Sequence, residues 1–195
     1  MRIEKVERKI EIPQGIELIV QTPFVTVKGP KGEMKKRLLS KEITSERSQN
    51  QLKFILKNAK RTEKMQLGTL CAHIRNMIEG VKNGYTYRLK ICSSHFPMSV
   101  VVQGNDIIIK NYLGERHPRK ARILEGVKAK VEANIITLEG NDIELVGQTA
   151  SNIELAAQIR DKDRRVFQDG IYIYEKAGKK LEWPQAILKG TKQTN

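Results

Sequence analysis

The chain has 195 residues, of which 39% are hydrophobic, and this is enough for one large or two small domains with cores of their own. Its 36 lysines and arginines exceed its 22 acidic residues and give a net charge of +14, which favours polyanionic partners, nucleic acid before an anionic membrane surface. A spanning helix, a signal peptide and a zinc site are disfavoured, because no apolar run is long enough, residues 1–9 alternate charges, and Cys71 and Cys92 form no CxxC motif.

The first half begins as a series of short strands in which apolar and charged residues alternate. Turn residues interrupt this pattern at 13–15 and again at 29–32, where Gly29 and Gly32 flank Pro30. Strands are expected over residues 3–12, 16–21, 24–28, 33–39, 43–47 and 51–56. Together they would form one small antiparallel sheet.

An amphipathic helix should follow this sheet, because apolar residues then recur at spacings of three and four. Its apolar positions are Met65, Leu67, Leu70, Cys71, Ile74, Met77 and Ile78. Thr62 is the expected N-cap and Gly80 the expected end, so that residues 81–84 would link two domains. The apolar stripe of the helix should lie on one face of the sheet.

The second half repeats the same order of strands, hairpin and helix, with strands expected over residues 85–92, 98–102, 106–111, 127–131 and 135–138. A second helix should follow Gly140 to Asp142, and Ser151 would either form a capping box with Glu154 or lie inside the helix. Short matches align the halves, among them residues 27–29 with 109–111, and indicate an internal duplication. We therefore predict an α+β fold of two duplicated small domains, each an antiparallel sheet packed against a helix. The predicted divisions are domains at 1–83 and 84–176 and a basic tail at 177–195.

Residues 160–176 read RDKDRRVFQDGIYIYEK and open with six consecutive charged residues, which make a poor core element. We interpret Asp169-Gly170 as a turn before a strand, and residues 116–122 as a loop dense in cations. Three basic clusters, the first at 31–37, the second at 116–122 and the third at 160–165, would bind the phosphates of a folded RNA, although each could also be a solvated face. Phe167 would either stack on a base or pack in the core. The candidate RNA-binding residues are Lys31, Lys35, Lys36, Arg37, Arg116, His117, Arg119, Lys120, Arg122, Arg160, Lys162, Arg164, Arg165 and Phe167.

Catalytic motifs are weak by comparison. Ser94 and His95 are adjacent and could pair, but the chain has no GxSxG nucleophile elbow, and residues 29–36 do not match a P-loop. We expect no catalytic residues, no metal, no cofactor and no small-molecule substrate.

Five motifs together resemble one known family: VKGPKGE at 27–33, HIRNMIEGV at 73–81, SHFP at 94–97, EGNDIELVGQTASNIE at 139–154 and RDKDRRVFQDGIYI at 160–173. They are similar to the universal large-subunit ribosomal protein six in its archaeal and eukaryotic form, which eukaryotes call large-subunit protein nine. The resemblance covers residues 3–176 and implies two similar sheet-plus-helix domains without catalytic residues. The last motif places Arg160, Lys162, Asp163, Arg165, Phe167, Asp169 and Gly170 on the signature of the family.

The resemblance implies a structural constituent of the large ribosomal subunit in the cytoplasm. It would bind large-subunit rRNA, chiefly through the second domain, near the sarcin-ricin loop, the translational GTPases and neighbouring ribosomal proteins. Two alternatives stay open from the residues alone. One is an RNA-modifying or RNA-cleaving enzyme, which turnover by the purified protein would support. The other is a module that binds another polyanion, such as a membrane surface, which pelleting with liposomes would support.

Overall fold

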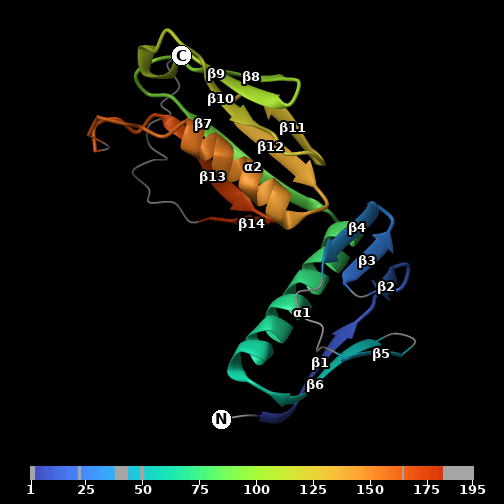
Figure 1. Ribbon diagram of the computed structural model, residues 1–195. Helices are drawn as coiled ribbons and strands as arrows, with labels where there is room; N and C mark the ends of the chain where they lie inside the picture. The colour runs from blue at the N-terminus through green and yellow to red at the C-terminus, as the bar shows by residue number, and fades with distance from the viewer. Residues whose placement is uncertain (1–2, 22, 38–43, 49–50, 164, 182–195) are drawn as a thin grey trace. The chain divides into compact units, whose positions relative to one another are not determined.

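The computed structural model describes residues 3–21, 23–37, 44–48, 51–163 and 165–181 (Figure 1). Its contacts divide the chain into two compact units, Met1–Gly84 and Tyr85–Asn195, with the division one residue after the predicted one. Met1–Gly84 is unit 1 and Tyr85–Asn195 is unit 2. Arg164 and most of the expected tail lie outside the described residues.

Unit 1 contains two antiparallel sheets in its described part, where the sequence predicted one. The first sheet joins β1 (Ile3–Glu11), β6 (Gln51–Ala59) and β5 (Thr44–Ser48) in that order, and the second joins β2 (Glu17–Gln21), β3 (Phe24–Gly29) and β4 (Gly32–Arg37). The chain turns between β1 and β2 at Gly15, whose φ is 85°. Because of this turn β2 pairs with β3, while β1 pairs with the distant β6.

The helix of unit 1, α1 (Arg61–Lys82), extends beyond the predicted end. Its N-cap is Lys60 rather than Thr62, and the backbone N–H of Lys60 donates to the carboxylate of Glu63 at 2.8 Å. That bond is half of a capping box, which fixes the start of the helix one turn before the acidic residue. Gly80 lies inside the helix and not at its end, so the first half of the expected linker is helical.

The apolar stripe of α1 packs against β1, β3, β4 and β6, as predicted. Of the predicted stripe only Met65, 59% exposed, lies outside the core. The buried stripe residues are Leu67, Leu70, Cys71, Ile74, Met77 and Ile78. Burial raises the pKa of the Cys71 thiol, as expected for a structural rather than a reactive cysteine.

Unit 2 has the same parts and two further strands. In the residues described, one sheet is ordered β11, β12, β7, β13, β14 and the other β10, β9, β8 (Figure 1). The bounds of these strands are β7 (Tyr85–Cys92), β8 (Ser99–Gln103), β9 (Asp106–Lys110), β10 (Arg119–Arg122), β11 (Val127–Glu132), β12 (Ile135–Gly140), β13 (Gly170–Lys176) and β14 (Lys179–Lys180). A short 3-10 turn, Tyr112–Gly114, follows β9.

The second helix, α2 (Ile143–Ala156), packs against strands of both sheets, as α1 does in unit 1. Its N-cap is Asp142, whose side chain accepts the backbone N–H of Glu144 at 2.9 Å. Ser151 lies inside the helix and does not cap it, which decides between the two alternatives. Val146 and Ile153 are fully buried in the core of unit 2.

The two units are copies of one topology. The order β1-β6-β5 corresponds to β7-β12-β11, the order β2-β3-β4 to β8-β9-β10, and α1 to α2. In the two helices, Leu67 and Val146 are both 0% exposed, and Ile74 and Ile153 are likewise buried. These correspondences confirm the α+β fold of two duplicated domains, each with antiparallel sheet packed against a helix.

Two local predictions in unit 2 are wrong. Residues 119–122 are not part of a loop but form β10, which pairs with β9. Asp169-Gly170 is not a turn, because Gly170 begins β13 and Asp169 is only 3% exposed. After β13, Ala177 and Gly178, with φ of 49° and 78°, turn the chain so that β14 pairs with β13.

Candidate nucleic-acid interface

The charged segment between α2 and β13 is held as a defined loop by its own backbone. The side chain of Asp163 accepts the backbone N–H of Arg165 at 2.9 Å, and its carbonyl accepts the N–H of Phe167 at 2.9 Å. Such an aspartate turn leaves the flanking cations outside. Arg160, Lys162 and Arg165 are exposed, whereas the predicted neighbour Arg164 is outside the described residues.

Both ends of this loop meet at one buried hydroxyl. The Oη of Tyr112 lies 2.6 Å from the carbonyl oxygen of Ala157 and 3.3 Å from that of Asp169, so it can donate to either end of the loop. Burial raises the pKa of Tyr112 to about 12, which keeps the phenol protonated and able to donate. The loop therefore leaves and re-enters the core at nearly the same place.

A second anchor is the carboxylate of Asp169. It accepts backbone N–H groups from Ser94 at 2.5 Å and His95 at 3.0 Å, and it also accepts the Ser94 hydroxyl at 3.1 Å. Its Oδ2 lies 2.5 Å from His95 Nδ1. Burial by itself would raise the pKa of Asp169, but the hydrogen bonds from His95 and Ser94 outweigh it and hold this pKa below its usual value.

The ring of Phe167 contacts both His95, a partner of Asp169, and Lys162 of the charged loop. Its ring lies 4.6 Å from the ring of His95, centroid to centroid, and the Nζ of Lys162 is 4.7 Å from the Phe167 centroid. The ring also packs against the core of unit 2 at a half-buried position. Of the two roles foreseen for Phe167, the structure shows packing, and it shows that a cation of the loop rests on the exposed part of the ring.

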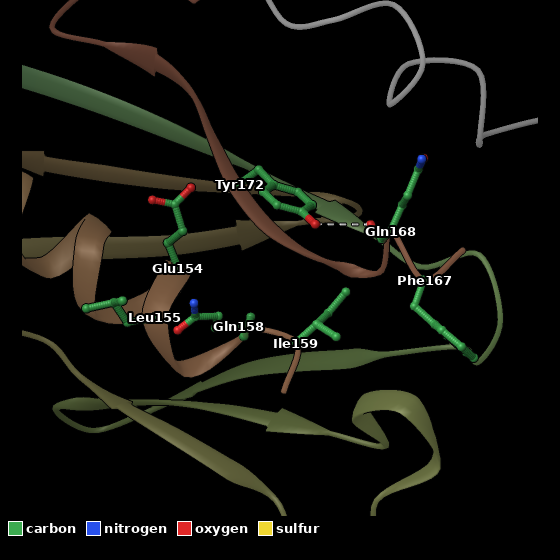
Figure 2. A pocket seen from close by; sticks show the side chains of 8 residues that line it. Glu154, Leu155, Gln158, Ile159, Phe167, Gln168 and Tyr172 are labelled. Carbon is green, nitrogen blue, oxygen red and sulfur yellow. Dashed lines mark hydrogen bonds between the residues drawn. The ribbon is translucent and has the colours of Figure 1, made fainter. Parts of the chain in front are cut away.

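A pocket of about 440 Å³ opens beside the loop (Figure 2). Its walls come from the end of α2, the loop and β13, and Tyr172 donates from its hydroxyl to the carbonyl of Gln168 at 3.2 Å. The lining residues are Glu154, Leu155, Ala157, Gln158, Ile159, Phe167, Gln168 and Tyr172. Glu154 supplies the one carboxyl of this lining, so the pocket has no pair of acid and base groups for catalysis.

The second basic cluster divides between two faces of β10. Arg119 points inward, where its Nε and Nη2 donate to Glu115 at 2.8 and 2.6 Å and its Nη1 donates to the carbonyls of Ala156 and Gln158 at 3.0 and 2.8 Å. Its guanidinium also lies 4.0 Å from the ring centroid of Tyr112. Arg119 thus ties β10 to the start of the charged loop.

The ion pair of Arg119 and Glu115 shifts the pKa of both side chains. The hydrogen bond from Arg119 holds the pKa of Glu115 below its usual value, and that same bond raises the pKa of Arg119. The neighbouring cations of the cluster are placed differently. Arg116, His117, Lys120 and Arg122 are exposed, and Lys120 and Arg122 share the outer face of β10.

The first basic cluster also divides. Lys31 donates from its side chain to the carbonyl of Asn83, and its backbone N–H donates to Val81 at 3.1 Å, which fixes the turn before β4 to the end of α1. Lys35 lies over the ring of Phe24 at 4.4 Å. Lys35 and Arg37 are exposed, whereas Lys36 alternates with them and is half-buried.

The sequence had suggested that Ser94 and His95 could pair, and they do, at 3.0 Å. The contact is not a nucleophile triad, because the serine hydroxyl and the Asp169 carboxylate both approach the same ring nitrogen, Nδ1. In a triad the imidazole bridges the two groups with opposite nitrogens. Asp169 and Tyr112 were not among the predicted site residues; Asp169 was missed because Asp-Gly is usually a turn.

Residues 3–21, 23–37, 44–48, 51–163 and 165–181 contain neither a membrane-spanning helix nor a metal cluster. No helix there is long and apolar enough to cross a membrane. No three His, Cys, Asp or Glu side chains of those ranges are grouped so that they could hold a metal ion.

Comparison with known proteins agrees with this architecture. The model of the family described as ribosomal protein L6 matches residues 12–84 and 96–170, one stretch in each unit. The large ribosomal subunit protein uL6 of Sulfurisphaera tokodaii is 47% identical over 179 residues, which cover 90% of this chain and 95% of the relative. Proteins of the same name from Aeropyrum pernix and Ignicoccus hospitalis are each 44% identical and cover 88% and 85% of this chain, and 94% and 91% of their own. The chain therefore belongs to the ribosomal protein L6 family.

Proposed function

We propose that this ribosomal protein binds large-subunit rRNA through the charged loop of unit 2 and acts there as a structural constituent of the subunit, in the cytoplasm. The observation that carries the proposal is the double anchoring of the loop. Tyr112 and Asp169 fix its ends to the core, so Arg160, Lys162 and Arg165 are presented without much loss of chain entropy on binding.

The mode of binding would be contact with phosphates and recognition of shape. Guanidinium groups bind phosphate oxygens in a bidentate way, and the exposed cations of the loop and of residues 116–122 lie in the same unit. Lys31, Lys35, Lys36 and Arg37 would add contacts from unit 1. Arg119 has an internal role in the structure, so we assign it to positioning the loop and not to RNA.

The neighbourhood within the subunit follows from the family resemblance. Members of the family are expected near the sarcin-ricin loop and the translational GTPases, among other ribosomal proteins, and we extend that location to this chain. Membership also argues against the alternative of an enzyme that modifies or cleaves RNA, because the relatives are ribosomal proteins.

The test is the salt dependence of binding to a large-subunit rRNA fragment by the full chain. Replacing Arg160, Lys162 and Arg165 together by Gln should make the negative slope of log K against log salt shallower by about 2 to 3. Each lost phosphate contact removes about 0.7 to 0.9 from the magnitude of this slope. The matched control replaces Arg75, Lys128 and Lys130, which are equally exposed cations on other elements. Equal slopes for the two triple variants would overturn the role of the loop.

The location is tested separately in cells. Crosslinking of the chain to RNA, followed by sequencing, should recover nucleotides around the sarcin-ricin loop. Crosslinks confined to rRNA far from that loop would refute the location and leave RNA binding itself intact.

A further inference from the structure

The ladders of the two three-stranded sheets have the same register. In unit 1 Lys35 pairs with Thr26, and Arg37 pairs with Phe24. In unit 2 Lys120 pairs with Ile108, and Arg122 pairs with Asp106. Because β3 and β4 correspond to β9 and β10, Lys35 is equivalent to Lys120 and Arg37 is equivalent to Arg122.

The third strand of each sheet extends the equivalence. Lys28 pairs with Glu17 as Lys110 pairs with Ser99, so the two lysines occupy the same position of the central strand. Ile19 pairs with Thr26 in unit 1. At the same place in unit 2, Val101 pairs with Ile108. The same face of each sheet therefore carries three cations at equivalent positions, with an aliphatic side chain on the opposite edge strand.

These side chains lie on the face of the sheet that is turned away from the core. Side chains alternate along a strand, and the residues next to Lys28 and Lys110, Val27 and Ile109, are both 0% exposed. All six cations are exposed. Ile19 and Val101, on the edge strands β2 and β8, are 36% and 48% exposed, respectively. Three exposed cations at fixed spacing on one face of a sheet are suited to contact the phosphates of an RNA backbone.

Protection of sheet edges does not account for the whole arrangement. Lysine and arginine on an edge strand hinder the addition of further strands, and β4 and β10 are edges of their sheets in the described part of the chain. Lys28 and Lys110, however, lie on the central strands β3 and β9, where no edge has to be protected. Both copies keep a lysine there, although nothing in the packing of the core requires it.

We propose that these two outer faces are equivalent RNA-backbone surfaces, so that one chain holds two separate segments of rRNA. The repeated cationic face consists of Lys28, Lys35 and Arg37 in unit 1 and of Lys110, Lys120 and Arg122 in unit 2. This inference rests on the proposed function, that the chain binds rRNA, and adds a second, duplicated surface to the charged loop.

The two faces differ in the acidic residues next to their cations, and this difference predicts which face binds RNA more tightly. On the face of unit 1, Lys28 forms an ion pair with Glu33 at 3.4 Å, and Glu17 lies opposite Lys28 on β2. On the face of unit 2, Asp106 is the acidic side chain of the ladder, opposite Arg122. The face of unit 2 is therefore the more positive, and it should bind RNA more tightly.

The experiment uses the full chain and full-length large-subunit rRNA. Each face is neutralised by three Gln substitutions, and salt slopes and hydroxyl-radical footprints are compared with those of the wild type. Each triple variant should reduce the magnitude of the negative salt slope by about 2 to 3. Each should also expose a different set of nucleotides, while the footprint of the other face remains.

Variants of opposite sign guard against loss of folding. Glu33→Gln and Asp106→Asn each remove a negative charge from one face and should raise affinity for the rRNA several-fold at low salt. A triple variant that binds with an unchanged slope, or that only self-associates, would show that its cations protect the sheet and would overturn the proposal. That result would leave the charged loop unaffected, because the loop has its own variant.

Discussion

The Nδ1 of His95 lies 2.5 Å from the Oδ2 of Asp169, although 74 residues separate them in the chain. The contact closes the loop that carries the exposed cations onto the segment after β7. Asp169 is buried and receives hydrogen bonds from Ser94 as well, so one carboxylate fixes two segments.

Asp169→Asn should lower the free energy of unfolding of unit 2 by about 1 to 3 kcal/mol, because a buried group loses charge-assisted hydrogen bonds. The control is Asp163→Asn in the same loop, where an exposed side chain caps a turn and the amide oxygen can still accept from Arg165. Urea unfolding, resolved by hydrogen exchange of β7 and β13, measures both variants. Equal stabilities for the two would contradict the anchoring role of Asp169.

The stability that Asp169 contributes should depend on pH in one direction. Its pKa is lower in the folded than in the unfolded chain, so the contribution is complete above the unfolded value of about 3.9 and is lost as the pH falls through the folded value. The difference in unfolding free energy between wild type and Asp169→Asn should therefore shrink from pH 5 toward pH 2, on the order of one proton per molecule. If this difference in unfolding free energy stays constant from about pH 5 to about pH 2, the Asp169 carboxylate does not stabilise the fold through its ionised form.

Arg119 and Lys120 are adjacent, and their substitutions should have opposite effects. Arg119→Gln removes the contacts with Glu115 and with two carbonyls and should cost about 2 to 3 kcal/mol of stability. The RNA salt slope should change little. Lys120→Gln should change the free energy of unfolding by less than about 0.5 kcal/mol. It should reduce the magnitude of the negative salt slope by about 0.7 to 0.9. Thermal unfolding and filter binding measure both variants. A stable Arg119→Gln variant with a shallower salt slope, or an unstable Lys120→Gln variant, would contradict these roles.

Gly29→Ala should destabilise unit 1 through a steric contact. A Cβ at Gly29 would lie 2.4 Å from the Cγ1 of Val81, a fully buried side chain at the end of α1. Overpacking of this kind costs about 1 to 3 kcal/mol. Gly68→Ala is the control, since nothing lies within 4 Å of its added Cβ and helix propensity should stabilise α1 by about 1 kcal/mol. Val81→Ala combined with Gly29→Ala should recover part of the loss, and the absence of any recovery would argue against the contact.

The repeat of strands, hairpin and helix was readable from the sequence, because periodicity is a local property. Alternation marked the strands, spacings of three and four marked α1, and the offsets between the halves revealed the duplication. The high charge and the dense cations indicated a polyanion as partner, since net charge is a sum over residues and requires no coordinates.

The division into two sheets per unit and the roles of individual cations were decided by tertiary structure. Arg119 and Lys120 look alike in the sequence, yet the pleat of β10 sends one toward Tyr112 and the other to the outer face. Asp169 was read as a turn residue because its partners, Ser94 and His95, are remote in the chain. Composition alone predicts a polyanionic partner, because net charge is a sum over residues, whereas pairing between distant strands decides which cationic side chains are exposed.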